Sequence, residues 1–162
     1  MSKEMLDEHR IIVRLAAQPE RPYLERLMGL YLYDMTEFIG EPQRELEYAY
    51  PDIERYWQEV ERYPFFIEYD TMRIGFALVT ETPEHTVMSE FFIPRHFRRM
   101  RIGAEAAALI FDRFPGRWRV AEMAGNRTAQ RFWRQVIDEY TDGRFDEVEE
   151  EGWEGPIQYF DG

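Results

Sequence analysis

The stretch that decides the fold is "RHFRRMRIGAEAAALIF", Arg95–Phe111, in which four arginines precede an apolar run. Apolar side chains recur in the run at the three- and four-residue spacing of a helix, and acidic ones fall between them. The expected buried face consists of Ile102, Ala106, Leu109 and Ile110, and the expected exposed face includes Glu105 and Asp112. The run therefore predicts an amphipathic helix that begins directly after the arginines.

The arginine-rich loop before this helix favours a bound anion. The first backbone N–H groups of a helix have no partner within it, and the helix dipole is positive at that end. Arg98, Arg99 and Arg101 add charge there, and Gly103 lets the backbone approach a ligand closely. A phosphate or pyrophosphate suits such a site. The arginines could equally pair with surface acids, and spacing alone leaves the two interpretations open.

Strand and helix patterns flank this helix on both sides. The runs "TVMSEFFIP" (86–94) and "GRWRVAEM" (116–123) read as strands on either side of it, so a β-α-β unit with a parallel pairing is expected. Further expected elements are a strand at 10–16, helices at 22–40 and 53–60, a hairpin over 64–80, a helix from 126 to at least 137, and a last hairpin from "RFDEVEE" (144–150) and "PIQYF" (156–160). The predicted order is β-α-α-β-β-β-α-β-α-β-β in one domain, residues 1–162.

Composition restricts the class of protein. The chain has no cysteine, which excludes disulfides and a thiol nucleophile and suits the reducing cytoplasm, where we expect the protein to act. Its three histidines lie far apart in sequence, so no metal site is expected. The sequence contains neither a signal-peptide pattern nor 18 consecutive apolar residues, so we expect no secretion and no membrane partner.

The charge balance restricts the partners. Lys and Arg number 20 against 32 Asp and Glu, so the formal net charge is −12, which argues against a nucleic-acid binder because phosphate would be repelled. A cationic substrate would be attracted. The alternative is that the acidity serves only solubility.

The loop and the following helix resemble a known family, the GNAT N-acetyltransferases. In that family a loop of pattern [QR]-x-x-G-x-[GA], between the fourth strand and third helix, binds acetyl-CoA. The segment 98–103, "RRMRIG", resembles it, with Arg101 in place of the first glycine. The segment "NRTAQRFW" (126–133) resembles a second family feature, in which Asn opens the next helix and is followed by Ala and an aromatic pair. The expected element order resembles the family fold over essentially the whole chain.

The resemblance implies the fold, the cofactor and the reaction. The fold would be α/β (α+β), with a mixed, mostly antiparallel twisted sheet of about six or seven strands flanked by about four helices. The reaction would be acetyl transfer from acetyl-CoA to a primary amine, without a metal. Arg101 could serve in the loop, and add charge, if its φ is negative. The cofactor-binding residues that the resemblance implies are Phe92, Ile93, Arg98, Arg99, Met100, Arg101, Ile102, Gly103, Ala104, Asn126 and Trp133.

Candidate acids and bases follow from this chemistry. Trp133 stands where many family members have a tyrosine that protonates the thiolate, and an indole is no useful acid. Tyr140 or water could replace it, or the thiolate could leave unaided. An amine nucleophile must lose a proton, so a carboxylate is expected: Glu90 first, because it interrupts an apolar strand, and Glu122 second. Either acid could instead merely meet solvent or an arginine.

The acceptor pocket would come from the first two helices, their loop and the last hairpin. These segments are rich in aromatic residues (Tyr31, Tyr33, Tyr48, Tyr50, Tyr56, Trp57, Trp153, Tyr159) and acids (Asp34, Glu37, Glu45, Glu47). The combination suits a cationic amine. Two other functions stay open: an acyl-CoA-binding module without catalysis, and an acidic protein-interaction domain. A homodimer is also kept as an open alternative.

Overall fold

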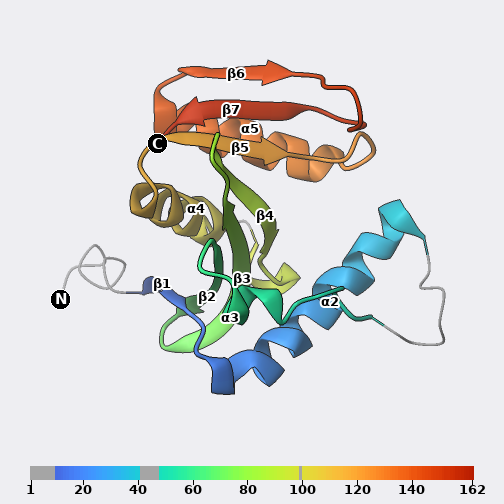
Figure 1. Ribbon diagram of the computed structural model, residues 1–162, viewed down its shortest axis with the longest axis vertical. Helices are drawn as coiled ribbons and strands as arrows, with labels where there is room; N and C mark the ends of the chain where they lie inside the picture. Colours follow the sequence, from blue (N-terminus) through green and yellow to red (C-terminus); the bar gives the residue numbers. More distant parts are fainter. Residues whose placement is uncertain (1–9, 41–47, 99) are drawn as a thin grey trace.

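The computed structural model describes residues 10–40, 48–98 and 100–162, and it confirms the predicted order of elements (Figure 1). A seven-stranded sheet has the order β1-β2-β3-β4-β5-β7-β6. The strands are β1 (Ile11–Leu15), β2 (Arg62–Tyr69), β3 (Met72–Glu81), β4 (Thr86–Phe92), β5 (Arg117–Ala121), β6 (Phe145–Val148) and β7 (Ile157–Asp161). The helices are α2 (Arg21–Ile39), α3 (Arg55–Gln58), α4 (Ile102–Arg113) and α5 (Arg127–Thr141), with 3-10 turns η1 (Gln18–Glu20) and η2 (Arg95–Phe97).

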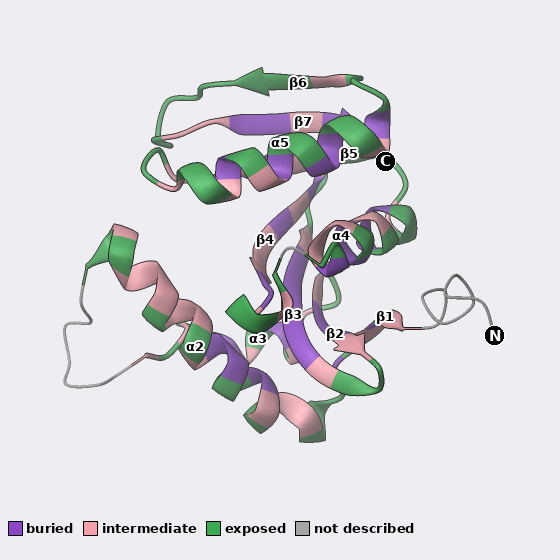
Figure 2. Cartoon of the chain, turned by 180° about the vertical axis from the view of Figure 1, so that it is seen from behind, coloured by how far each residue is buried: buried purple, intermediate pink, exposed green. Residues whose placement is uncertain are grey.

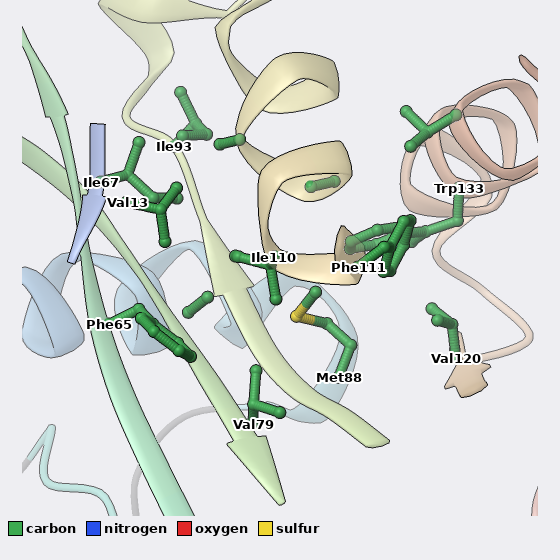
Figure 3. Packing of buried hydrophobic residues seen from close by; sticks show 14 of the residues in the cluster. Val13, Phe65, Ile67, Val79, Met88, Ile93, Ile110, Phe111, Val120 and Trp133 are labelled. Atoms are coloured by element: carbon green, nitrogen blue, oxygen red, sulfur yellow. The ribbon is translucent and has the colours of Figure 1, made fainter. Parts of the chain in front are cut away.

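The helices cover both faces of the sheet. Neighbouring residues of β2 enter different cores, because side chains alternate along a strand: Phe65 joins the core under α4 and α5, whereas Phe66 joins the core under α2 and α3. In the first of these cores, Ile110 and Phe111 of α4 lie against Met88 and Trp133 (Figure 3). The central strands are buried on both faces, which explains why they read as continuous apolar runs.

Helix α2 is anchored by its N-terminal half. Its buried residues, Leu24, Leu27 and Met28, all lie there, and the C-terminal half extends away from the sheet with more exposed side chains (Figure 2). No helix in the described ranges is long and apolar enough to span a membrane. Beyond Met28, Tyr31 and Leu32 still pack against the core under α2, whereas Tyr33 and Ile39 are exposed.

The sheet separates in its middle. Strands β4 and β5 run parallel, as predicted, but they pair only through Thr86 with Trp118 and Val87 with Arg119. Beyond Val87 the ladder ends, and Figure 1 shows β5, β7 and β6 running across the direction of β3 and β4. Because unpaired strand edges present free backbone N–H and C=O groups, this separation leaves the C-terminal half of β4 able to bind an extended ligand.

Two details of the predicted helices are wrong. The helix expected at 53–60 is only α3, because Glu59 already has extended backbone angles, and Val60 is 88% exposed in the turn before β2. Leu109 was expected on the buried face of α4 but is 40% exposed. The buried face of α4 runs instead through Ala107 and Phe111, so it is rotated away from Leu109.

Candidate functional site

A bulge in β4 sets the direction of Glu90. Leu78 of β3 pairs with Glu90 and the next residue, Val79, pairs with Met88, so Ser89 is an extra residue in β4. Met88 belongs to the core under α4. Without the bulge, alternation would direct Glu90 to the same face as Met88, but the extra residue turns it toward α2.

Two tyrosine hydroxyls hold the Glu90 carboxylate. Tyr31 of α2 donates a hydrogen bond to Oε2, and Tyr50, in the segment before α3, donates one to Oε1 over 3.3 Å. Phe92, two residues after Glu90, lies on the same face of the sheet and packs against the Tyr31 ring. The alternative that Glu90 merely meets solvent or an arginine is therefore wrong: its partners are phenols.

Burial and hydrogen bonding act on Glu90 in opposite directions. Burial raises its pKa because the charged form loses water, while the bonds from Tyr31 and Tyr50 favour the charged form and lower the pKa. Burial is the larger effect, so the pKa of Glu90 lies above the ordinary value of a glutamate. Such a carboxylate is a stronger base than an exposed one.

The N-terminus of α4 presents backbone donors. Arg101 is the N-cap residue, its side chain makes no capping bond, and the first bond of the helix runs from the Glu105 amide to the Arg101 carbonyl at 3.1 Å. The amides of Ile102, Gly103 and Ala104 precede that bond and can serve an anion. A Cβ on Gly103 would lie 3.1 Å from Cζ of Phe132, so a glycine lets α5 approach this turn closely.

Arg101 has φ of 62°, in the left-handed region. The negative φ under which an arginine was expected to serve in the loop is therefore not observed. The backbone keeps a conformation that favours glycine, although the side chain is arginine. That side chain points out of the loop, and its Nη2 donates to Glu139 of α5 at 2.7 Å.

Arg95 and Arg98 also pair with an acid. Arg98 donates from Nε to the Ile93 carbonyl at 2.7 Å and from Nη2 to Asp34 of α2 at 2.9 Å, and Arg95 donates to the same Asp34 at 3.1 Å. Asp34, expected among the acids for a cationic amine, is thus already neutralised. Met100 is exposed, and Arg99, expected to bind the cofactor, lies outside the described residues. Both interpretations of the stretch hold in part: its described arginine side chains meet acids, while the backbone of α4 remains available to an anion.

The residues around α4 fit the pyrophosphate and pantetheine of acetyl-CoA, the co-substrate implied by the resemblance. The uncapped first turn of α4 suits a pyrophosphate, and small residues, Gly103 and Ala104, stand there. The unpaired edge of β4, with Phe92 and Ile93 at its end, suits the amides of pantetheine. The Ile93 side chain is buried in the core, and its carbonyl already accepts the Arg98 bond, so the backbone of this corner is held in place.

Asn126 and Trp133 lie on α5, on the other side of the strand separation. Asn126 is the N-cap, and its Oδ1 accepts from the Ala129 amide at 3.1 Å, so this oxygen is occupied by the helix. Trp133 is buried, with its ring 5.0 Å from that of Phe91 on β4 and 4.9 Å from that of Phe132. Trp133 thus closes the α5 side of the separation as an apolar wall.

Glu122 follows β5 and is only 4% exposed. Gln158 of β7 donates from Nε2 to Glu122 Oε1 at 2.8 Å, whereas Glu122 Oε2 and Gln158 Oε1 have no partner among the described residues. Burial, more than the nearby Glu147, raises the pKa of Glu122 to about 8. Glu122 therefore stays a second candidate for the base, in surroundings where burial favours its protonated form.

Tyr140 lies two turns beyond Trp133 on α5, about 10 Å along the helix axis. Its hydroxyl donates to Asp112 at 2.7 Å, and its ring packs against Phe111. Burial and the Asp112 bond raise the pKa of Tyr140 to about 12. Both its position and its weak acidity speak against a role as proton donor.

The fold brings some of the candidate residues together and separates others. Glu90 lies on β4 two residues before Phe92, and the chain continues from there through Ile93 and η2 to the first turn of α4, whereas Glu122 is bonded to Gln158 and Tyr140 to Asp112. Sequence reasoning placed Tyr31 and Tyr50 only in a general pocket and missed that both bind Glu90. It also missed Gln158. No local signal marks these contacts, since Tyr31 and Glu90 are 59 residues apart.

Two surface hollows lie away from Glu90. One of about 490 Å³ is formed by α5 and β6 and includes Arg134 and Glu147, and one of about 440 Å³ is formed by α2, the β2–β3 turn and η2 and includes Tyr23 and Phe97. Neither hollow is lined by Glu90. The candidate site is thus described by its backbone donors and its carboxylate.

Comparison with known proteins gives a family. Residues 27–136 match the family model described as "Acetyltransferase (GNAT) family". This range contains Glu90, both tyrosines that bind it, and the loop before α4. No curated protein is similar enough in sequence to count as a match.

Solved structures with the same fold include three acetyltransferases of low sequence identity. An acetyltransferase from Thermus thermophilus has a TM-score of 0.72 at 16% identity, over 94% of this chain and 97% of that one. PaiA N-acetyltransferase from Thermoplasma acidophilum, in complex with coenzyme A, has 0.66 at 13%, over 94% and 99%. Spermidine N-acetyltransferase from Vibrio cholerae, in complex with CoA and spermine, has 0.64 at 9%, over 93% and 95%.

Proposed function

The chain belongs to the acetyltransferase (GNAT) family, and on that premise we propose that it transfers an acetyl group from acetyl-CoA to a primary amine of a small molecule or peptide. One observation carries the proposal. A half-buried carboxylate, Glu90, lies on the part of β4 that does not pair with β5, two residues before the end of the strand, and β4 leads through η2 to the uncapped first turn of α4. The proposed base and the proposed anion-binding donors are therefore joined by one short segment of the chain, residues 90–104.

The chain supplies two binding elements for the co-substrate. Backbone amides of Ile102, Gly103 and Ala104 would hold the pyrophosphate, assisted by the positive end of the α4 dipole. The free edge of β4 near Phe92 and Ile93 would pair with the pantetheine arm. Acetyl-CoA, when bound, supplies the acetyl thioester. A backbone N–H of β4 near Phe92 would also donate a hydrogen bond to the negatively charged acetyl oxygen of the transition state. With good geometry, such a bond lowers the activation free energy by on the order of 3 kcal/mol.

Glu90 would act as the general base. An alkyl amine with a reference pKa of about 10.4 is mostly protonated at neutral pH, so it must lose a proton before it can attack. Glu90 can accept that proton directly or through a water molecule. Its raised pKa makes it better suited to this than an exposed glutamate.

No described residue at the family's tyrosine position supplies an acid, because Trp133 stands there and Tyr140 is engaged with Asp112. A thiol with a pKa of about 8.5 needs little help as a leaving group. We therefore assign the proton that it receives to water, and the chain itself provides only the base.

A cationic amine is the acceptor that the charge of the chain favours. The net charge of −12 would attract it, and aromatic rings of α2 and the segment before α3, including Tyr31 and Tyr50, stand beside Glu90. The spermidine N-acetyltransferase of similar fold, with spermine bound, is consistent with this choice. The same charge disfavours nucleic acid. We further propose that the protein acts in the cytoplasm, since a chain without cysteine suits a reducing compartment.

Two measurements test the proposed function. Calorimetry with CoA and acetyl-CoA should show binding, and thiol release should appear with amines from a panel that spans mono- and polyamines. Binding without turnover on a broad panel would favour a non-catalytic acyl-CoA-binding module. If CoA does not bind, and Arg98→Ala and Gly103→Glu change no ligand-linked property, a protein-interaction domain is the better description. A thermal-shift screen of amines in the presence of CoA would select the acceptor.

A further inference from the structure

The two oxygens of the Glu90 carboxylate have unequal partners. Oε2 accepts a hydrogen bond from Tyr31, whereas Oε1 accepts one of 3.3 Å from Tyr50. Hydrogen bonds between a hydroxyl and an oxygen are normally about 2.5–3.0 Å long, so the Tyr50 bond is longer and weaker than usual, and the Tyr31 bond lowers the pKa of Glu90 more than the Tyr50 bond does. An incoming hydrogen-bond donor would therefore meet less competition at Oε1 than at Oε2.

Tyr31 is held rigidly. Its ring makes edge-on contacts with Phe76, at 5.6 Å between centroids, and with Phe92, at 5.7 Å. Both phenylalanines are buried side chains of the sheet. Because the ring is fixed on two sides and its backbone belongs to α2, the hydroxyl has one direction, toward Glu90.

Tyr50 is held differently. It belongs to the irregular segment that precedes the turn into α3, and its bond to Glu90 is the longer one. An ammonium group forms a charge-assisted bond to a carboxylate that is roughly twice as strong as a neutral one. An arriving amine can therefore replace Tyr50 at Oε1 more easily than it can replace Tyr31 at Oε2.

We propose that Tyr31 is a positioning residue for Glu90, and that it directs Oε1 to the amine as the oxygen that accepts the proton. Tyr31 keeps its bond to Oε2 throughout, while the amine exchanges with Tyr50 at Oε1. The proton moves from the ammonium nitrogen to Oε1, and the nitrogen lone pair becomes available for attack on the acetyl carbon. This inference rests on the proposed function, because it deepens the role of the same base.

Few charged groups among residues 10–40, 48–98 and 100–162 bear on Glu90. Tyr31 faces it from α2 and Tyr50 from the segment before α3, and these two bonds with burial account for the direction of its pKa. Asp34, one turn further along α2, is neutralised by its ion pairs with Arg95 and Arg98. A change of the Tyr31 hydroxyl should therefore be read directly in the titration of Glu90.

The decisive variant is Tyr31→Phe, which keeps the ring and its packing but removes the hydroxyl. Two readouts are needed: the titration of Glu90 in the free protein by NMR with 13C-labelled glutamate, and the pH profile of kcat/KM for acetyl transfer. Loss of the bond disfavours the charged form, so both the titration and the acid limb of the profile should move to higher pH. The kcat on the high-pH plateau should fall about tenfold, because the Glu90 carboxylate is no longer held in one orientation toward the amine. The KM for acetyl-CoA should stay unchanged.

Two further variants control the result. Tyr50→Phe should move the Glu90 titration by less than Tyr31→Phe does, because the lost bond is longer. Tyr23 lies two turns before Tyr31 on α2, and its hydroxyl donates to the Arg73 carbonyl at 3.0 Å. Tyr23→Phe should therefore leave the Glu90 titration and the pH profile at their wild-type values. Urea unfolding of all three variants would show whether a loss of rate follows from a loss of fold.

Failure of this inference and failure of the proposed function give different results. A titration and a pH profile that stay unchanged in Tyr31→Phe would overturn the positioning role, even if acetyl transfer is confirmed. If wild-type protein acetylates no amine, the proposed function fails, and the NMR titration alone then decides whether Tyr31 holds the carboxylate. A larger titration shift in Tyr50→Phe than in Tyr31→Phe would overturn the assignment of Oε1.

Discussion

Arg98 donates a hydrogen bond to Asp34 over 2.9 Å, and this ion pair joins the loop before α4 to helix α2. The same guanidinium bonds the Ile93 carbonyl at the end of β4. One side chain therefore links the proposed cofactor loop, the strand of the proposed base and the helix that carries Tyr31. We therefore expect the conformation of the loop to depend on this link more than on the charge of Arg98.

Arg98→Ala should weaken CoA binding about tenfold or more, because the loop loses its bonds to β4 and α2 together. Calorimetric titration with CoA measures the change. The matched control is Arg95→Ala. The Arg95 guanidinium pairs with the same Asp34, but the Arg95 side chain is 77% exposed, so its removal should change CoA affinity little. Equal losses in both variants would mean that positive charge, and not the link, holds the cofactor.

The backbone of Arg101 leads to a stability prediction. Its φ of 62° costs an ordinary residue roughly 1–2 kcal/mol, a cost that glycine avoids and a β-branched residue meets in full. Arg101→Gly relieves this cost in the folded state, but glycine also gains conformational entropy in the unfolded chain, which offsets most of the relief. The variant should therefore unfold at the same or a slightly higher urea concentration. Arg101→Val should be less stable than Arg101→Gly by about 1–2 kcal/mol. Glu139→Gln, which removes only the exposed partner of Arg101, should change little, and an equal loss there would assign the effect to the ion pair.

Glu122 should make stability depend on pH. Its pKa in the folded protein is about 8, above the unfolded value of about 4.3, so the folded state binds the proton more tightly. The stability that this provides is complete below about pH 4.3, declines as the pH rises, and is lost once the pH passes about 8. Wild-type protein at pH 9 then contains a buried charge.

Glu122→Gln therefore should gain stability over wild type as the pH rises from 5 to 9, by about 1–3 kcal/mol at the upper end. The added amide stays neutral and can also donate to Oε1 of Gln158, which has no partner at present among the described residues. Urea unfolding at both pH values provides the measurement, with Glu149→Gln at an exposed position as the control. A difference from wild type that is the same at pH 5 and pH 9 would contradict the assignment.

The pH dependence of activity should identify the base. Because burial raises the pKa of Glu90, the rate of wild-type acetyl transfer should increase with pH through a pKa above the ordinary glutamate range. Glu90→Gln should lower kcat about 10²- to 10⁴-fold and remove that limb of the profile. Glu61→Gln, at an exposed position before β2, should keep both rate and profile. A profile in Glu90→Gln parallel to that of wild type would exclude Glu90 as the base.

Much of the fold follows from local patterns. The apolar runs of the central strands, the helical spacing of α4 and α5, and the breakers between elements predict the order of all seven strands. The parallel pairing of β4 with β5 follows as well, because a helix lies between them. Patterns are less informative where apolar residues are few, as at Val60, which is expected in a helix but lies in a turn.

The candidate site depended on contacts that no local pattern encodes. An apolar strand interrupted by one acid was enough to select Glu90, and the arginine stretch was enough to expect an anion beside α4. Neither pattern shows that Ser89 is an extra residue in its ladder, because a bulge arises from the pairing of two strands. That bulge decides which face Glu90 occupies.

The sequence by itself determined the class of fold, the position of the arginine loop before a helix, and the candidate base, because each depends on residue type and short spacing. Only the tertiary structure decided that Tyr31 and Tyr50 bind Glu90, that Asp34 neutralises Arg98, and that Glu122 is buried beside Gln158. These decisions shift pKa values and occupy donors, and they arise from residues that are far apart in the chain and meet only when the sheet and its helices assemble.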